Sequence, residues 1–336
     1  MPSHAVRDDV AHTARAIARA RARETARGDL ALVVDRYAEA FADGSSSFTN
    51  DDSSTSTTTP STRTSRRRRI ADDDRVDDID RDRGRLAVRT KFFDDAIVDA
   101  CARARNGASS TQVVVVGAGL DSRAWRLTPK RRARDDVQAN VVVFEIDDER
   151  VLRGKRALAK KVDEALGRQS GMEFASRREE CYANIERDDW FGALERSGFQ
   201  RNAHTVWVLE GLLYYLTERA VREVISRAAS SSAPGSTLVA SVVNAAAVKR
   251  AKAATFLTKI KRALGFARTP AKARWKSSCE EPETYFAPWR VDVVAQPGDE
   301  RCSYGRWTGA PPPARESIND ARIDTIPRTY YVIATL

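Results

Sequence analysis

Short apolar runs alternate with helical stretches along residues 110–336 of the chain. The runs that predict buried strands cover residues 112–116, 141–146, 181–183, 205–209, 237–243, 291–294 and 330–335. Between the early runs, residues 149–166 and 218–229 repeat apolar side chains at three- and four-residue spacing, which predicts helices, with Thr217 as a candidate N-cap. Alternating strands and helices are typical of βαβ units. The pattern therefore predicts an α/β fold with a doubly wound, mainly parallel sheet.

Helical spacing also occurs in two segments nearer the start of the chain. Residues 5–42 carry two apolar stripes, separated by Gly28-Asp29, and are predicted to be helical on both sides of that break. The first stripe consists of Val6, Val10, Ala14 and Ile17, and the second of Leu30, Val33, Val34, Tyr37 and Phe41. Order resumes at Leu86, and residues 92–104 form the next predicted helix. We expect residues 1–43 to pack as a helical segment on a main domain of residues 86–336.

Residues 44–85 lie between these two parts and differ from them in composition. They contain Ser, Thr and Asp with few apolar residues, a basic run at 66–69 and an acidic stretch at 72–82. Such a segment cannot bury enough apolar surface to offset the entropy of ordering it. We expect a disordered insertion. Its basic run is either a solvated tether paired with nearby Asp residues, or a nuclear or nucleic-acid signal.

A second interruption, residues 245–288, lies between the fifth and sixth predicted strands. Basic residues stand beside apolar ones there, among them Lys249, Lys252, Phe256 and Ile260. The pattern predicts a basic amphipathic helix followed by a loop. In this position the segment would act as a lid over a substrate.

Composition restricts the class of protein further. Of the 336 residues, 42% are hydrophobic, which is enough for a sizeable core. The formal net charge of +10 favours acidic partners such as nucleic acid, an acidic protein tail or a membrane surface. An Arg-rich solvated surface is the simpler explanation of that charge.

The cysteines and the hydropathy pattern indicate the compartment. The four cysteines show no CxxC spacing and have no neighbouring His, which argues against a zinc site or a disulfide framework. No apolar run approaches the ~20 residues that span a bilayer, and the N-terminus lacks a signal-peptide core. We expect an intracellular, cytoplasmic protein without a metal site and without a membrane partner.

A glycine turn is the most informative local pattern. Four valines at 113–116 precede Gly117-Ala118-Gly119. The valines predict a strand buried on both faces, and the glycines let the backbone turn sharply and approach a ligand beyond the strand end. Ser122 stands where a dinucleotide motif has its third Gly, and no GK[ST] follows, so a nicotinamide cofactor and a P-loop are disfavoured. The turn predicts a nucleotide-like cofactor, with a plain tight turn as the alternative.

Acidic residues end two further strands at the same predicted edge. Glu145 and Asp147 end the second strand, where a carboxylate can accept hydrogen bonds from ribose hydroxyls. We favour Glu145 for this role because it closes the apolar run. Glu210 ends the fourth strand, and Tyr214 and Tyr215 follow it. These two rings either face a cation or pack in the core.

Four motifs in this order resemble the leucine carboxyl methyltransferase family. They are RTKFFDD at 89–95, GAGLDSRAWRL at 117–127, FEID at 144–147 and EGLLYYL at 210–216. The resemblance extends to residues 13–38 and to Tyr304-Gly305-Arg306, and covers most of the chain outside 44–85. It implies a Rossmann-like class-I methyltransferase fold with a mostly parallel seven-stranded sheet and a helical N-terminal extension. It also implies S-adenosyl-L-methionine as the cofactor.

The same resemblance implies roles for individual residues around that cofactor. Arg89 would pair with the carboxylate of the methionine moiety, for which a guanidinium fork is suited, and Glu210 would lie by its ammonium. Glu145 would hold the ribose. The turn residues at the cofactor would be Gly117, Gly119 and Asp121.

Two further roles concern the adenine and the methyl acceptor. Where the family has an Asp-Leu pair at the adenine, this chain has Asn184-Ile185, with Asp188 as a nearby substitute. Tyr215 matches the family tyrosine near the acceptor and is the candidate catalytic residue. Asn184 is therefore a position at which this chain departs from the family pattern.

O-methylation of a carboxylate, on a small molecule or at a protein C-terminus, is the reaction expected from the resemblance. A carboxylate is ionised at neutral pH and needs no general base, so catalysis would depend on proximity, alignment and exclusion of water. A hydroxyl acceptor would need a base, and His204 or Glu210 would have to serve. Two alternatives stay open: a cofactor-binding regulatory protein without transfer activity, and an RNA-acting methyltransferase. Nucleic acid is not the expected partner, because no aromatic-rich RNA-binding module is visible.

Overall fold

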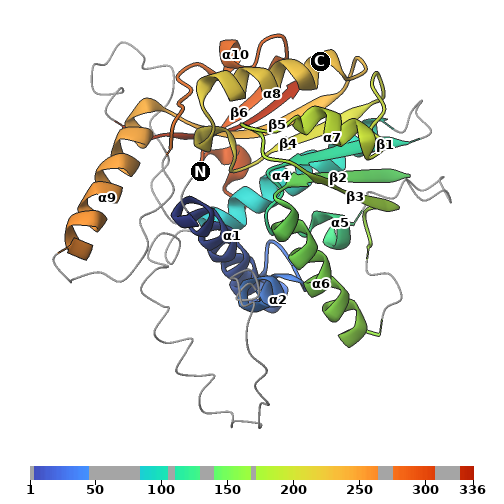
Figure 1. Cartoon of the computed structure of the whole chain (residues 1–336), viewed down its shortest axis with the longest axis horizontal. Coiled ribbons are helices and arrows are strands. Elements are labelled where there is room, and N and C mark those ends of the chain that lie inside the picture. The colour runs from blue at the N-terminus through green and yellow to red at the C-terminus, as the bar shows by residue number, and fades with distance from the viewer. Residues whose placement is uncertain are drawn as a thin grey trace, which may run out of the picture.

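A single sheet of seven strands, with helices on both faces, organises the chain (Figure 1). The computed structural model describes residues 4–44, 84–104, 110–128, 140–167, 172–263, 275–306 and 326–336. The strands are β1 Thr111–Val116, β2 Val141–Asp147, β3 Arg177–Tyr182, β4 Thr205–Leu209, β5 Thr237–Val243, β6 Arg290–Ala295 and β7 Thr329–Thr335. All seven predicted strands are confirmed. The predicted insertion at 44–85 lies outside the described residues except at its ends.

The order of the strands is β3-β2-β1-β4-β5-β7-β6. Strands β1 to β5 pair in parallel, whereas β7 lies between β5 and β6 and runs antiparallel to both. The strand order reverses between β1 and β4, so their connections leave toward opposite faces of the sheet. In sheets of this kind the crevice beyond the carboxyl ends of such strands receives the ligand.

Strand β3 is longer than its apolar residues predict. It begins at Arg177, four residues before the predicted start, and its first four residues are Arg177, Arg178, Glu179 and Glu180. Because β3 is an edge strand, charged side chains are tolerated there, and they discourage pairing with another chain. The polar sequence hides this strand from a search for buried runs.

The helices cover the sheet in two layers. Beside three short 3-10 turns, the described helices are α1 His4–Thr25, α2 Ala38–Asp43, α4 Arg85–Ala104, α5 Arg123–Arg126, α6 Glu149–Ala165, α7 Trp190–Arg196, α8 Glu218–Ser230, α9 Ala245–Ala263 and α10 Pro282–Tyr285. Thr217 caps α8 as predicted, with Oγ1 accepting from the Ala220 N–H at 3.4 Å. No helix in the described part of the chain combines the length and the apolar character needed to cross a bilayer.

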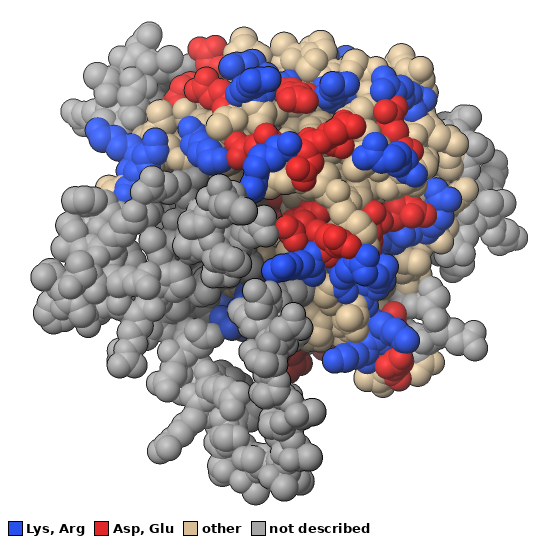
Figure 2. Space-filling view, in the orientation of Figure 1, with Lys and Arg blue, Asp and Glu red and all other residues tan. Residues whose placement is uncertain are grey.

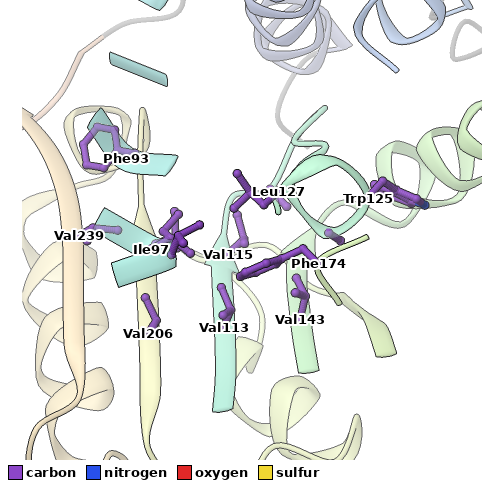
Figure 3. Packing of buried hydrophobic residues seen from close by; sticks show 14 of the residues in the cluster. Phe93, Ile97, Val113, Val115, Trp125, Leu127, Val143, Phe174, Val206 and Val239 are labelled. Carbon is purple, nitrogen blue, oxygen red and sulfur yellow. The ribbon is translucent and has the colours of Figure 1, made fainter. Parts of the chain in front are cut away.

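Each face of the sheet has its own apolar core. On one face, α4 contributes Phe93 and Ile97, which pack over Val113, Val206 and Val239 of the central strands (Figure 3). The N-terminal helices join this core, since Ala18 of α1 and Phe41 of α2 are fully buried in it. The other face packs against α7, α8 and α10. Burial on both faces explains why β1 can consist of apolar residues along most of its length.

The prediction that the second apolar stripe of the N-terminal segment forms a helix is wrong. Only a 3-10 turn at Gly28–Leu30 and the short α2 are helical between residue 28 and residue 44, and Leu30 and Val34 are exposed. Side chains take up the backbone donors instead. Glu24 accepts from the Leu32 N–H and Thr25 from the Asp35 N–H, each at 2.8 Å. Such local bonds compete with helix formation.

Candidate functional site

The carboxyl ends of β1, β2 and β4 meet at one edge of the sheet. Register places Val116 beside Ile146, and Val115 beside Val208. The glycine turn follows β1, and the N–H groups of Gly117 and Ala118 both donate to the carbonyl of Ile146. This turn is therefore fixed against the end of β2.

Both glycines of the turn have backbone conformations that side chains disfavour. Gly117 has φ +67° and Gly119 has φ +48°. A Cβ on Gly117 would come within 2.8 Å of Leu212 Cδ1, whereas on Gly119 the nearest atom would be Ala14 Cβ at 3.7 Å. The turn thus requires glycine at 117 for space, and it leaves room above Gly119 under helix α1.

Two carboxylates near the end of β2 have different surroundings. Glu145 is only 1% exposed, and its Oε2 lies 2.7 Å from Lys155 Nζ and accepts from Arg178 Nε at 2.9 Å. Asp147 ends the strand, and its Oδ2 accepts from the Gly119 N–H at 2.6 Å. Burial raises the pKa of Asp147, although backbone donors partly offset this. Of the two, Asp147 is the one in contact with the glycine turn.

Glu210, at the end of β4, is held between two arginines. Arg89 Nε donates to Glu210 Oε1 at 2.7 Å, and Arg123 donates to Oε2 at 2.5 Å. The Arg89 and Glu210 side chains are 13% and 10% exposed, so the pair is largely buried at the end of β4. Burial disfavours the charged form of Arg89, but the adjacent Glu210 carboxylate outweighs this effect and raises the pKa of Arg89. The structure brings together these two predicted residues, which are 121 positions apart.

Arg123 connects this pair to a third predicted residue. Besides Glu210, it donates to Asp94 Oδ1 and Asp121 Oδ2, each at 2.6 Å. Burial opposes ionisation of Asp121, but Arg123 and Lys155 outweigh it and lower its pKa to about 2. Asp121 therefore stabilises the turn through Arg123, and its place among the cofactor-binding residues, which the resemblance implies, stays a prediction.

The network of buried charges continues into the N-terminal segment. Arg126 makes two hydrogen bonds to Asp94, at 2.6 and 2.9 Å. Asp35, 2% exposed, accepts from Ser122 Oγ at 2.6 Å and from Arg21 Nε at 2.7 Å. Arg21 also donates to the Leu120 carbonyl at 2.6 Å. Helix α1 and the segment after it are thus tied to the glycine turn itself.

Tyr215, the candidate catalytic residue, belongs to an aromatic cluster formed by residues after Glu210 in the chain. Its ring centroid lies 4.8 Å from that of Tyr214, which lies 4.8 Å from that of Trp275. Burial raises the pKa of Tyr215, while contacts with Trp275, Arg89 and Thr13 lower it less. Tyr215 therefore carries its proton at neutral pH and can act as a donor, not as a base.

Asn184 and Ile185 lie in a turn after β3. Asn184 is exposed, and its Oδ1 accepts from the Glu186 N–H at 3.1 Å while its own N–H donates to Asp188 Oδ2 at 2.7 Å. Ile185 packs partly against the core under α7 and α8. Asp188 therefore shapes this turn.

His204 is remote from this edge. It precedes β4, and six residue steps along that strand separate it from Glu210 by roughly 20 Å at ~3.3 Å per residue. Its Nε2 lies 2.9 Å from the Gly235 carbonyl, and burial lowers its pKa. His204 is consequently not placed to serve as a base for chemistry beside Glu210.

Sequence reasoning missed the buried charges that support the site. These residues are Arg21, Asp35, Asp94, Arg123, Arg126, Lys155 and Arg178. A signal existed for some of them. Asp94 interrupts an apolar helix, and Arg123 and Arg126 flank a Trp at the three-residue spacing that puts them on one helical face. Among the described residues, no three His, Cys, Asp or Glu side chains converge to hold a metal ion.

Residues 14–229 match the family model described as leucine carboxyl methyltransferase. The chain belongs to this family. The predicted resemblance is confirmed, and with the strand order so is the class-I methyltransferase fold. The matched span of this leucine carboxyl methyltransferase family member includes the glycine turn, the ends of β2 and β4, and the Arg89–Glu210 pair.

Individual relatives of this family member carry related names. A protein of Mycobacteroides abscessus, named an S-adenosyl-L-methionine-dependent methyltransferase, is 40% identical over 155 residues, or 46% of this chain and 44% of that protein. A Streptomyces coelicolor protein with the same type of name is 34% identical over 233 residues, or 69% of this chain and 66% of that protein. The match thus spans less than half of the first relative. The crystal structure of a Thermobifida fusca methyltransferase is 18% identical with a TM-score of 0.41, covering 75% of this chain and 82% of that one.

Proposed function

We propose that this protein is an S-adenosyl-L-methionine-dependent methyltransferase that transfers the methyl group to a carboxylate. The observation that carries the proposal is the Arg89–Glu210 pair at the end of β4, beside the glycine turn. An adjacent cation and anion, both nearly buried, complement the amino and carboxylate groups at the methionine end of this cofactor. The names of the relatives support the same cofactor.

The residues at the sheet edge fit the cofactor in one arrangement. Arg89 would bind its carboxylate and Glu210 its ammonium. The backbone of Gly117 and Gly119 would lie beneath it, with the Leu212 side chain close to Gly117 and open space at Gly119. Asn184 and Ile185 would meet the adenine from the turn after β3. Arg123 and Asp121 would support these residues, because their hydrogen bonds hold Glu210 and the turn in place.

Asp147 is the better candidate for the ribose than Glu145. Glu145 uses Oε2 for Lys155 and Arg178, and its Oε1, which has no hydrogen-bond partner among the described residues, is closed off from solvent, so a ribose could reach it only if the surrounding side chains moved. Asp147 ends the strand, is partly exposed, and touches the Gly119 backbone. We therefore assign the ribose to Asp147 in this proposal, and a supporting role to Glu145.

The surroundings of the site favour an acceptor that is already ionised. The bound cofactor supplies an activated methyl group with its own leaving group. Glu210 is engaged by two arginines and Tyr215 keeps its proton, so neither is suited to remove a proton from an acceptor. Tyr215 would instead donate a hydrogen bond to the acceptor. The aromatic cluster would exclude water and align the two reactants.

Calorimetric titration with adenosylhomocysteine tests the cofactor and its orientation. Arg89→Ala and Asp147→Asn should each lose about 1.5–3 kcal/mol of binding, or roughly 10- to 150-fold, because each removes a bond to a charged group. Glu145→Gln should mainly lower the melting temperature, with a smaller effect on the affinity for adenosylhomocysteine, because Glu145 has a supporting role in this proposal. Arg219→Ala, on the exposed side of α8, is the control and should bind like wild type. No binding by the folded wild-type protein would refute the cofactor assignment.

The nature of the product tests the carboxylate assignment separately. Methyl esters hydrolyse in mild base and release volatile methanol, whereas methyl ethers and methylamines do not. Tritium transferred from labelled cofactor should therefore become volatile after base treatment of the product. A base-stable product would overturn the carboxylate assignment. Cofactor binding without any transfer would instead favour a regulatory protein of the same fold.

A further inference from the structure

Lys155 of α6 is fully buried, and it is the one lysine of which this holds in the part of the chain whose side chains the structure describes. Lys160 and Lys161 of the same helix are exposed. Figure 2 shows the usual situation of Lys and Arg, which lie at the surface among Asp and Glu, where water and salt screen them. Lysine is almost never fully buried unless it is paired, and burial lowers the pKa of Lys155. Its position therefore requires a physical reason.

The carboxylate that Lys155 contacts, Glu145, has a second cation as well. Lys155 Nζ lies 2.7 Å from Glu145 Oε2. The same oxygen accepts two hydrogen bonds from Arg178, from Nε at 2.9 Å and from Nη2 at 2.5 Å. Arg178 is fixed in turn, because its guanidinium carbon lies 4.6 Å from the centroid of the Trp125 ring. Glu145 therefore keeps an ion pair without Lys155, and a further buried cation at this oxygen points to a role beyond Glu145.

The charge of Lys155 acts on carboxylates at the edge of the sheet. Glu145 and Asp147 lie on the same face of β2, two residues or roughly 7 Å apart at ~3.3 Å per residue, so an ammonium that contacts Glu145 also lies near Asp147. Burial raises the pKa of Asp147, and Lys155 opposes this rise. At the glycine turn, Lys155 is the second cation after Arg123 that lowers the pKa of Asp121 against burial. Lys155 thus lies among three carboxylates, two of which belong to the candidate site.

The groups around Asp147 on other elements do not replace this cation. Burial raises the pKa of Asp147, and Asp148, the N-cap of α6, raises it further through its like charge. Tyr182, the register partner of Asp147 on β3, carries no charge at neutral pH, because burial raises its pKa. Arginines of the neighbouring elements are engaged elsewhere: Arg21 pairs with Asp35, Arg123 with Asp121 and Arg178 with Glu180, and Arg153 lies over the Tyr182 ring. Among the described groups, Lys155 is therefore the cation that favours ionised Asp147.

From these contacts we propose that Lys155 is a positioning residue for the ribose of the cofactor: from inside the core, its ammonium keeps the Asp147 carboxylate charged beneath the ribose hydroxyls. The inference rests on the proposed function for the ribose, and on burial and geometry for Lys155. Lys155 does not touch the cofactor in this proposal. It acts through Asp147, so its removal should change how the affinity for the ribose depends on pH.

The hydrogen bonds of Asp147 explain why its charge matters. Its Oδ2 accepts from the Gly119 N–H and its Oδ1 from the Asp148 N–H, while an ionised carboxylate offers about four acceptor sites. Each oxygen thus keeps a site for one ribose hydroxyl, and protonation of Asp147 would occupy one of these sites. A ribose above Asp147 also excludes water, which disfavours the charged form of the carboxylate. Lys155 offsets this effect from the buried side.

Calorimetric titration with adenosylhomocysteine and with its 2′,3′-dideoxy analogue tests this role, because the ratio of the two affinities isolates the ribose hydroxyls. In wild type the ratio should fall with decreasing pH as Asp147 is protonated. In Lys155→Met the fall should be centred about one pH unit higher, because the nearby opposite charge is lost. The ratio should then be up to about tenfold smaller than in wild type on the acid side of the profile, and close to wild type on the alkaline side. Lys161→Met, which removes the same charge from the exposed side of α6, is the matched control and should follow wild type.

A purely structural role of Lys155 would give a different result. Lys155→Met would then weaken both ligands alike at every pH, and this outcome would overturn the inference, as would a profile equal to that of wild type. If Lys155→Met does not fold, the double variant Glu145→Gln/Lys155→Met replaces the buried contact by neutral groups, while Arg178 keeps Glu180 as its partner. The double variant also lacks the cation near Asp147, so the same shift of the profile is expected.

A measurement without ligand separates this inference from the proposed function. The carbon-13 resonance of the Asp147 carboxyl group, assigned by comparison with Asp147→Asn, follows its titration in the free protein. Lys155→Met should raise the pKa of Asp147, and Lys161→Met should leave it unchanged. If wild type bound neither ligand while this shift was present, the proposed function would be overturned and the action of Lys155 on Asp147 upheld. An unshifted Asp147 in Lys155→Met would overturn the inference at any cofactor affinity.

Discussion

Arg123 is the residue whose removal should affect the site most, because three buried carboxylates share its guanidinium. In Arg123→Met, Asp94 keeps Arg126 and Glu210 keeps Arg89, but Asp121 loses its principal partner. Breaking a buried ion pair by removing one partner costs about 3–5 kcal/mol. For Asp121 alone, the shift of its pKa from 3.8 to about 2 corresponds to roughly 2 kcal/mol. We expect Arg123→Met to lower the free energy of unfolding by an amount in the upper part of the range of about 3–5 kcal/mol. The melting temperature should fall by roughly 6–15 °C.

The pH dependence distinguishes this mechanism from a simple packing defect. In wild type, the lowered pKa of Asp121 stabilises the fold above about pH 4, and that contribution is lost as the pH falls toward 2. Without the Arg123 guanidinium, only Lys155, Arg126 and the N–H of residue 123 oppose the effect of burial, so we expect the folded pKa of Asp121 to rise above its unfolded value. The fold is then destabilised as the pH rises from the unfolded toward the folded pKa. Urea unfolding should therefore show a smaller deficit near about pH 5 than near about pH 8.

A double-mutant cycle completes the test. Adding Asp121→Asn to Arg123→Met removes the unpaired charge, while the amide oxygen can still accept from the Arg123-position N–H, as Oδ1 does now at 2.7 Å. The double variant should recover at least 1 kcal/mol of the loss, well above the ~0.5 kcal/mol scatter of additive sites. Equal deficits at both pH values, together with additive effects of the two substitutions, would refute the reasoning.

Three other features give measurable predictions. Gly117→Ala should lower the free energy of unfolding in urea by about 2 kcal/mol or more, because a left-handed backbone and a 2.8 Å contact of the new Cβ act together. Gly167→Ala has φ +66° but no atom within 4 Å of the new Cβ, so it should show only the backbone part, about 1–2 kcal/mol. Asp35→Asn should weaken the attachment of α1 by about 1–3 kcal/mol, seen as faster amide exchange of α1 with little change in β4; uniform exchange would contradict a local role. All four cysteines are buried, and burial raises the pKa of Cys101 to about 12, so native protein should react slowly with a thiol reagent near neutral pH and all four should react once unfolded.

Much of the fold is visible in the sequence because burial has a simple signature. The runs in β1, β4 and β5 are apolar along most of their length, since both faces of the sheet are covered. β3 was only partly predicted, because an edge strand needs no apolar run. The stripe from Leu30 to Phe41 was misleading, since side-chain oxygens compete there for the backbone donors that a helix requires.

The site was less predictable, because ion pairs depend on which residues the fold brings together. Arg89 and Glu210 were predicted from motifs, yet nothing in their spacing shows that they contact one another across 121 positions. Glu145 and Asp147 lie two residues apart on the same face of β2, so the strand period cannot separate them. The partners Lys155 and Arg178, which the fold brings to Glu145, are what favours Asp147 over Glu145 in the proposed assignment of the ribose.

The position of β7 has a consequence for how the chain folds as it is synthesised. β6 pairs only with β7 in the described sheet, and β7 is also the second neighbour of β5. At roughly 5–20 residues per second, β5 and β6 emerge seconds before the strand that joins them. The edge of β5 stays open during that interval, which makes it the point most exposed to pairing with another chain. Completion of the sheet is therefore set by the last strand to leave the ribosome.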